Sequence, residues 1–150
     1  MSSASARDLD LYGDEATVES LLRDTSVWAV VGLSASPTRL AYGVARVLQS
    51  HGKRILPIHP TAATVHGERG YATLADAVFE VGEIDVVDCF VNSTRVGDVV
   101  DQAIAIGAQA VWLQVGVIDE AAARRARDAG LRVVMDRCPK IEWEHHRPSV

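Results

Sequence analysis

The sequence predicts a single α/β domain: a doubly wound, parallel five-stranded sheet with helices on both faces. Five short, mostly apolar runs are separated by turn residues, and the first, at 27–31, shows no polar alternation, which is typical of a strand buried on both faces. Segments with helical spacing separate these runs, and such crossovers join parallel strands. Three expected helices pass through a glycine directly into the next strand, at Gly52, Gly107 and Gly130. We therefore expect the strands in the spatial order 2-1-3-4-5.

Composition agrees with this fold and excludes several classes of protein. The 150 residues are 48% hydrophobic and 23% charged, the average mixture for one soluble domain with one core. The net charge of -5 argues against nucleic acid as the main partner. No apolar run approaches the length of a membrane span, and the first ten residues lack the apolar core of a signal peptide. Two cysteines make no disulfide framework, so a cytoplasmic location is expected.

The first half of the chain predicts two helices and two strands after a polar start. An apolar stripe at Val18, Leu21 and Leu22 indicates the first helix, and Asp14 suits its positive end. The elements expected here are a helix from Asp14, a strand at 27–31, a helix at 42–49 and a strand at 55–58. Residues 1–13 are expected to form a flexible N-terminal segment.

The second half predicts three further helices and three strands. Thr73 and Asp119 are suitable N-cap residues, and either Ser93 or Thr94 caps the helix between them. The expected elements are a short helix at 73–77, a strand at 84–91, a helix to Ile106, a strand at 110–115, an Ala-rich helix ended by Gly130, and a strand at 131–135. We expect the domain to span 14–142 and residues 143–150 to form a C-terminal tail.

A ligand of such a sheet binds beyond the carboxyl ends of the strands, where the strand order reverses. Here that crevice lies between the loops at 32–39 and 91–94. Gly32 allows a sharp turn, nearby hydroxyls and helix N–H groups are donors, and Arg39 adds a positive charge suited to phosphate. The alternative is that the hydroxyls only cap the next helix and that Arg39 is solvated.

The loop is not the glycine fingerprint of dinucleotide-binding proteins. Ser34 and Pro37 stand where its second and third glycines belong, and His59 ends the second strand where an acid would bind an unphosphorylated ribose. The basic residues Lys53, Arg54 and His59 along the second strand suit a phosphorylated ribose better. No Lys-Ser/Thr pair follows a glycine, so the loop is not a P-loop either.

Several motifs together resemble the small, stand-alone CoA-binding domain proteins of bacteria and archaea. They are Gly32-Leu33-Ser34-x-x-Pro37-x-Arg39, Tyr42-Gly43-Val44, Pro57-Ile58-His59-Pro60, Val86-Val87-Asp88-x-Phe90, Ala103-Ile104-Ala105-Ile106-Gly107-Ala108, Val111-Trp112-Leu113-Gln114-x-Gly116 and Val133-Val134-Met135-Asp136-Arg137-Cys138. The resemblance covers about Ser26 to Glu142. It implies a Rossmann-like fold related to the CoA-binding domain of the succinyl-CoA synthetase α-subunit.

The resemblance also implies coenzyme A as the ligand, with its phosphates on the first loop and its adenine and ribose flanked by the loops after strands two and three. His59 departs from the asparagine common at that position, which puts that contact in doubt. The cofactor-binding residues expected on this basis are Gly32, Leu33, Ser34, Ser36, Arg39, Tyr42, His59, Pro60, Val91, Asn92, Ser93 and Gln114. Gln114 has the alternative role of fixing the loop at Gly116.

Other reactive residues have a structural and a chemical interpretation. Asp88 lies within a buried strand, so its carboxylate needs a partner; a structural role is favoured over catalysis. Cys138 beside Arg137 is either a reactive thiolate, able to form a mixed disulfide with CoA, or a core thiol. The histidines show no metal-binding spacing, and no metal site or catalytic residue is expected.

These observations favour a non-catalytic binding, carrier or regulatory module for CoA or an acyl-CoA. One alternative is a small nucleotide-dependent enzyme, an NAD(P)-type oxidoreductase or a transferase, that uses the same crevice. Another is an adaptor with a vestigial site, which an exposed apolar helix face would favour. A homodimer or a protein partner remains open, whereas a nucleic acid or a membrane is not expected.

Overall fold

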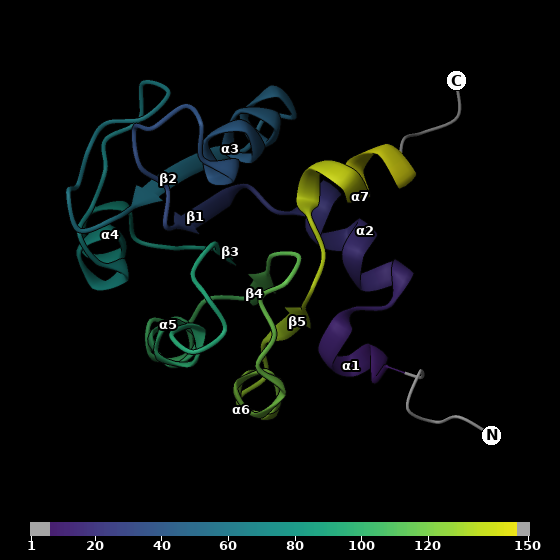
Figure 1. Ribbon diagram of the computed structural model, residues 1–150. Helices are drawn as coiled ribbons and strands as arrows, with labels where there is room; N and C mark the ends of the chain where they lie inside the picture. Colours follow the sequence, from purple (N-terminus) through teal and green to yellow (C-terminus); the bar gives the residue numbers. More distant parts are fainter. Residues whose placement is uncertain (1–6, 147–150) are drawn as a thin grey trace.

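The computed structural model describes residues 7–146 of the chain. Its five strands are all parallel and follow the order β2-β1-β3-β4-β5 (Figure 1), which confirms the fold class and the strand order expected from the sequence. The strands are β1 (Val27–Val31), β2 (Arg54–Ile58), β3 (Val86–Cys89), β4 (Ala110–Leu113) and β5 (Arg132–Val134). None of the described helices is long and apolar enough to cross a membrane.

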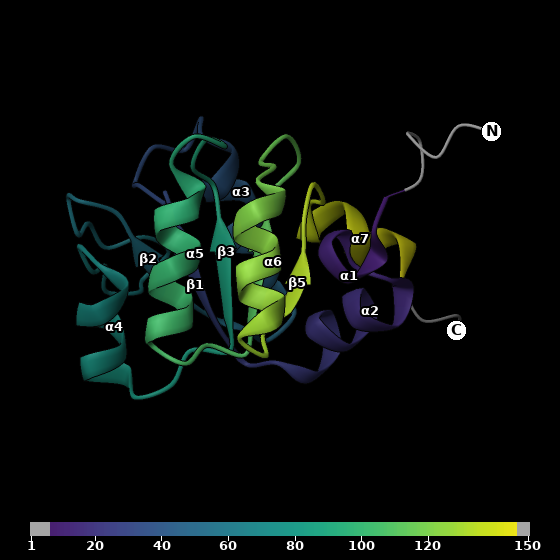
Figure 2. The ribbon, with the colours of Figure 1, turned by 90° about the horizontal axis from the view of Figure 1, so that it is seen from below.

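Helices cover both faces of the sheet, as Figures 1 and 2 show. One face carries α4 (Leu74–Val81), α5 (Val96–Ala105) and α6 (Glu120–Asp128). The other carries α2 (Glu15–Asp24), α3 (Leu40–Ser50) and α7 (Pro139–His145). Alternate residues of each strand pack on opposite faces, so the sheet divides two apolar clusters. Trp28 and Trp112, with ring centroids 5.6 Å apart, fill the second cluster.

Two of the expected helix caps are confirmed, at Thr73 and Asp119, and Asp14, expected at the positive end of its helix, also caps it. The side chains of Asp14, Thr73 and Asp119 accept hydrogen bonds from backbone N–H groups in the first turns of α2, α4 and α6. The cap expected at Ser93 or Thr94 is wrong, because α5 starts after Arg95 and has no side-chain cap. Both hydroxyls bond elsewhere: Thr94 donates to the Asn92 side chain, and Ser93 bonds to the loop after β4.

Both β3 and β4 end two residues before their expected ends. Parallel pairing stops at Cys89 and Leu113, and the chain then turns into the loops that border the site. The N–H of Val117 donates to the carbonyl of Gln114 at 2.8 Å, which closes the turn after β4. Apolar residues continue past these strand ends, so hydrophobicity alone overestimates the strand length.

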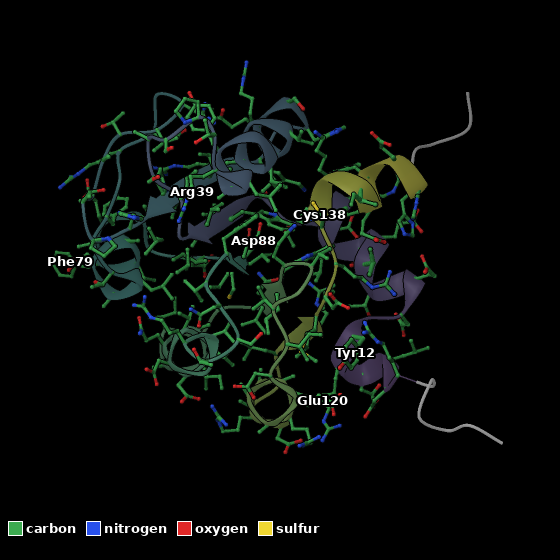
Figure 3. The ribbon with its side chains drawn as sticks, viewed as in Figure 1. Tyr12, Arg39, Phe79, Asp88, Glu120 and Cys138 are labelled. Carbon is green, nitrogen blue, oxygen red and sulfur yellow. The ribbon has the colours of Figure 1, made fainter. Side chains whose placement is uncertain are left out.

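The described part of the expected flexible N-terminal segment is packed against the domain. Residues Leu9–Tyr12 form the short helix α1 beside β5, with Leu11 buried in the core. The Tyr12 hydroxyl donates to Glu120 on α6 at 2.6 Å, and Figure 3 shows the two side chains facing each other. Arg137 donates to the carbonyls of Tyr12 and Gly13, which fixes the segment to the end of β5. The expectation of a flexible segment was wrong for residues 7–13, because a polar composition gives no indication of these contacts with distant parts of the chain.

The expected C-terminal tail from residue 143 begins inside a helix. Pro139 starts α7, where a missing N–H costs nothing, and the helix continues to His145. The Trp143 ring stacks on His51 at the end of α3, with centroids 3.9 Å apart and planes 9° from parallel. The short helix therefore packs on the α3 face. Residues 1–6 and 147–150 lie outside the described residues.

Candidate functional site

A cavity of about 450 Å³ lies at the carboxyl ends of β1, β2 and β3. Residues from the ends of all three strands line it, so it lies at the expected reversal of strand order. Its walls include Gly32, Arg39, His59, Pro60, Val91 and Asn92, which are six of the twelve expected site residues. We refer to it as the first cavity.

Gly32 is the first residue of the turn that follows β1. Its φ is +98°, and a Cβ at this position would lie 2.9 Å from the carbonyl oxygen of Phe90. Its N–H donates to the Ile58 carbonyl of β2 at 2.8 Å. Only glycine satisfies both the backbone angle and the close approach of the β3 chain.

Two arginines line the first cavity, and no acidic residue among 7–146 does. Arg39 precedes α3 and Arg95 precedes α5, and neither pairs with an acid within residues 7–146. The helix α3 has no side-chain cap, so no side chain accepts from the N–H groups of Leu40 and Ala41 in its first turn, whereas the Tyr42 N–H donates to the Arg39 carbonyl. Two cations and an open helix N-terminus make this edge of the sheet suited to an anion.

His59 borders the first cavity directly after β2. The Thr61 N–H donates to its Nδ1 at 3.2 Å, and the Thr61 hydroxyl lies 2.9 Å from the same nitrogen. Because Nδ1 accepts, the neutral ring carries its proton on Nε2. The imidazole can therefore donate to a ligand, as the side-chain amide of an asparagine could.

A second cavity of about 430 Å³ adjoins the first and shares Gly32, Arg39, Phe90, Val91 and Asn92 with it. Gln114 lines this second cavity and does not line the first. Two neighbouring spaces therefore open along the carboxyl edge of the sheet, joined at Arg39 and Asn92.

The other five expected site residues line neither cavity. Leu33 is fully buried in the core, and Tyr42 packs on the His66 ring with centroids 4.2 Å apart. The hydroxyls of Ser34, Ser36 and Ser93 bond to neighbouring loop residues. Likewise, Lys53 and Arg54 lie at the amino end of β2, opposite the site, where Lys53 donates to the Thr25 carbonyl. The expectation that these two face the ligand was wrong, because a strand carries only its last residues to the site.

Sequence reasoning missed several residues of the first cavity, above all Arg95. The loop at 91–94 was expected at the site, and Arg95 is the next residue. Its position directly after that loop is the feature of the sequence that could have identified it. Thr73 and Gln102 also line the cavity, from the start of α4 and from α5. No local pattern marks them, because α4 and α5 are brought to this edge only by packing on the sheet.

Asp88 lies fully buried in β3, between Val30 and Trp112 of the neighbouring strands. The expectation of a polar partner was wrong, since neither carboxyl oxygen bonds to any described residue. Burial raises the pKa of Asp88 well above its usual value, so the group is held as the neutral acid. Figure 3 shows it in the middle of the fold, and it lines neither cavity.

Cys138 is a core thiol and does not reach either cavity. It is 4% exposed and packs in the apolar cluster beneath α3 and α7. The guanidinium of Arg137 instead bonds to Tyr12, Gly13 and Glu142. The reactive interpretation of Cys138 therefore lacks both the exposure and the available cation that it needs.

One cluster of possible metal ligands is formed away from the cavities. Ligand atoms of Glu15, Glu142 and His146 lie within 4.8 Å of one another where α2 meets α7. Arg137 already places Nη1 3.0 Å from Glu142 and 3.8 Å from Glu15. The Arg137 guanidinium thus already balances part of the negative charge of this cluster.

Comparisons with known proteins agree on the fold. The sequence profile of a family described as "CoA binding domain" matches residues 26–144. The protein YneT of Bacillus subtilis (strain 168), described as uncharacterized, is 30% identical over 127 residues, which cover 85% of this chain and 92% of that protein.

Solved structures give the same result. A hypothetical protein from Pyrococcus horikoshii OT3 superposes with a TM-score of 0.83 at 32% identity, covering 94% of this chain and 96% of that chain. The acetyl-coenzyme A synthetase 1 of Ca. Korarchaeum cryptofilum, solved with phosphate and ADP, superposes with a TM-score of 0.68 at 27% identity. That match covers 78% of this chain and 27% of the synthetase chain, so it concerns one part of a larger enzyme.

Proposed function

The chain belongs to the CoA binding domain family, and on this premise we propose that it binds coenzyme A with the nucleotide half in the first cavity. The observation that carries this proposal is the chemistry of that cavity: among residues 7–146 it has two arginines without acidic partners, an uncapped helix N-terminus and no acidic lining residue. Coenzyme A carries a pyrophosphate and a 3′-phosphate on its ribose, which are the anions such a site fits.

The pyrophosphate belongs beside Arg39 and the first turn of α3. Arg39 borders both cavities, so a group bound there has the nucleotide on one side and the rest of the ligand on the other. The phosphorylated ribose belongs toward His59 and Arg95, whose donors face the first cavity from β2 and α5. Arginine binds phosphate oxygens through two parallel N–H donors, which fixes orientation as well as charge.

The same lining disfavours NAD as the ligand. NAD-binding sites of this architecture use a carboxylate to hold the ribose hydroxyls, and none of the residues that line the first cavity is acidic. A 3′-phosphate in the same place would be repelled by a carboxylate and attracted by His59 and Arg95. The cavity therefore favours a phosphorylated ribose.

We further propose that the protein is a binding, carrier or regulatory module without chemistry of its own. The cavity linings within residues 7–146 contain no cysteine, no serine and no acid, and the hydroxyl oxygens of Thr38 and Thr73 bond to neighbouring residues of their own segments. Nor does a single apolar helix face favour the adaptor alternative. The exposed large apolar side chains within residues 7–146 lie on four different helices and one loop: Leu9, Leu40, Phe79, Ile141 and, in the loop after β4, Val115. Figure 3 shows Phe79 pointing away from α4.

Calorimetric titration and thermal unfolding with CoA, acetyl-CoA, NAD and NADP test the proposal. At about a hundredfold excess over its dissociation constant, a ligand adds about 2.7 kcal/mol of stability. For a chain of this size, that corresponds to a melting shift of about 5–11 °C. We expect this shift for CoA or acetyl-CoA, and the stronger of the two identifies the preferred form. A shift with NAD or NADP alone would support the nucleotide-dependent enzyme, and no shift with any of them would support the adaptor.

A further inference from the structure

Three side chains from opposite ends of the chain meet where α2 and α7 pack together (Figure 1). Glu15 is the first residue of α2, Glu142 lies within α7, and His146 directly follows α7. One oxygen or nitrogen atom of each side chain lies within 4.8 Å of the other two. Glu142 and His146 are four residues apart and so share one face of the helix, whereas Glu15 comes from far away in the sequence. The spacing of the histidines alone therefore gives no sign of this cluster.

The Nε2 atom of His146 faces two carboxylates without forming a hydrogen bond. It lies 2.9 Å from Oε2 of Glu15 and 3.8 Å from Oε1 of Glu142. The atom is buried, and none of residues 7–146 is its hydrogen-bond partner. A neutral imidazole has a lone pair on one ring nitrogen. With that lone pair on Nε2, three electron-rich atoms converge on one point, and a cation there would satisfy all of them.

The Glu142 carboxylate is held in place by Arg137. The residue is 7% exposed, and Nη1 of Arg137 donates to its Oε1 at 3.0 Å. The other donors of that guanidinium bond to the carbonyls of Tyr12 and Gly13, so Arg137 is itself fixed. Carboxylates that bind metal ions are commonly oriented by a second hydrogen-bonding group of this kind. Two carboxylates and one guanidinium leave one negative charge at the cluster, so it still attracts a cation.

The backbone of His146 is also fixed, and the cluster is open to solvent on one side. The His146 N–H donates to the Glu142 carbonyl at 3.0 Å, and its own carbonyl accepts from Nη2 of Arg23 on α2 at 2.7 Å. The Glu15 side chain is 73% exposed, so an ion can enter past it and this carboxylate can adjust to bind the ion. Two of the three groups are thus placed in advance, and the third is free to move.

We propose that Glu15, Glu142 and His146 bind a divalent transition-metal ion, such as Zn²⁺, that fastens α7 to α2. One imidazole nitrogen and two carboxylate oxygens form the donor set, and imidazole favours such ions over Mg²⁺ and Ca²⁺. Bonds from Zn²⁺ to these atoms are about 2.0–2.2 Å long, so two ligands of one ion lie up to about 4 Å apart. A small movement of Glu15 meets this requirement. Three protein ligands leave a further position for water.

The proposed metal site is independent of the proposed CoA site, because none of its three residues lines either cavity. Its test is calorimetric titration of chelator-treated protein with ZnCl₂ and, separately, with MgCl₂. The removal variants are Glu15→Gln and His146→Ala, whereas Glu142 is left intact because it also pairs with Arg137.

The matched controls are Glu144→Gln and His145→Ala, which change exposed neighbours of the same chemistry in α7. Circular dichroism shows that each variant is folded before affinities are compared. Titration with Co²⁺ gives a visible absorption spectrum that reports on nitrogen and oxygen ligands.

We expect the wild type to bind one Zn²⁺ ion and to bind Mg²⁺ far more weakly. Glu15→Gln and His146→Ala should weaken Zn²⁺ binding at least about tenfold, and the two controls should stay within about twofold of the wild type. Zn²⁺ at about a hundredfold excess over its dissociation constant should raise the melting temperature of the wild type by about 5–11 °C. The same Zn²⁺ concentration should raise that of the removal variants by about half as much or less.

Three results would overturn the proposal. The first is a wild type that does not bind Zn²⁺. The second is an unchanged affinity in both removal variants, or an equal loss in the controls, which would show adventitious binding only. The third is Mg²⁺ binding as tight as that of Zn²⁺, which would exclude the nitrogen ligand. A Co²⁺ spectrum that His146→Ala alters and His145→Ala does not would support His146 as that ligand.

Discussion

Gly32 and Phe90 approach so closely that a Cβ on Gly32 would lie 2.9 Å from the Phe90 carbonyl oxygen. This contact joins the ends of β1 and β3 where the two cavities meet, since both residues line both. Because Gly32 has no side-chain methyl group, the ends of β1 and β3 can approach this closely. The positive φ of Gly32 independently favours glycine at this position.

Gly32→Ala should therefore destabilise the fold and impair ligand binding. The positive φ alone costs about 1–3 kcal/mol for a residue with a Cβ, before any shift of the Phe90 backbone. Urea denaturation measures the loss. Gly43→Ala is the matched control, because Gly43 lies in α3 with nothing within 4 Å of its Cβ position. That control should leave stability unchanged or raise it by up to about 1 kcal/mol. Equal effects of the two substitutions would contradict the role given to Gly32.

Arg39→Ala and Arg95→Ala should weaken CoA binding in different ways. A charge-assisted contact is worth about 1.5–3 kcal/mol, so each loss should exceed about tenfold in dissociation constant. Arg39→Ala should weaken CoA and dephospho-CoA alike, because both carry the pyrophosphate. Arg95→Ala should weaken CoA more, because only CoA carries the 3′-phosphate. Arg46→Ala, in α3 but outside both cavities, is the control and should bind CoA normally. If both variants also bind normally, the two arginines are surface residues.

Asp88→Asn should stabilise the protein more strongly as the pH rises. Burial raises the folded-state pKa of Asp88 above its value in the unfolded chain. The stability that the neutral acid contributes is complete below the unfolded-state pKa of about 3.9 and is lost as the pH rises through the folded-state pKa. Asparagine does not ionise, so the variant should gain about 1.4 kcal/mol per pH unit on the wild type between those two pKa values. Denaturation curves at several values from pH 4 to pH 8 provide the comparison. A difference that does not change with pH would show that Asp88 titrates normally.

Arg137→Ala should destabilise the protein by about 2–4 kcal/mol. The guanidinium donates to the Tyr12 and Gly13 carbonyls and to Glu142, a carboxylate that is 7% exposed. Its removal leaves that buried acid without this partner and releases α1 from β5. Arg124→Ala is the control, because its exposed pair with Glu120 at 3.7 Å should contribute less than about 1 kcal/mol. Equal stability of the two variants in urea would show that Arg137 does not fix the N-terminal segment.

The sequence by itself determined the fold. Short, mostly apolar runs are typical of strands in a doubly covered parallel sheet, and the glycines at 52, 107 and 130 follow helices at positive φ as expected. It also predicted the position of the first cavity, because a loop after β1 must lie at the carboxyl edge in this topology. Gly32, Arg39 and His59 were found for this reason: their place in the chain fixes their place in the fold.

Tertiary structure alone decided which polar residues remain available for a ligand. Ser93 and Tyr42 have the right position and chemistry, yet Ser93 bonds to the loop after β4 and Tyr42 packs on His66. Tertiary structure also brought Arg7 to Asp136 across most of the chain length, and it left Asp88 without a partner. Such pairings depend on distances between elements far apart in sequence, whereas local patterns report only the face of one strand or helix.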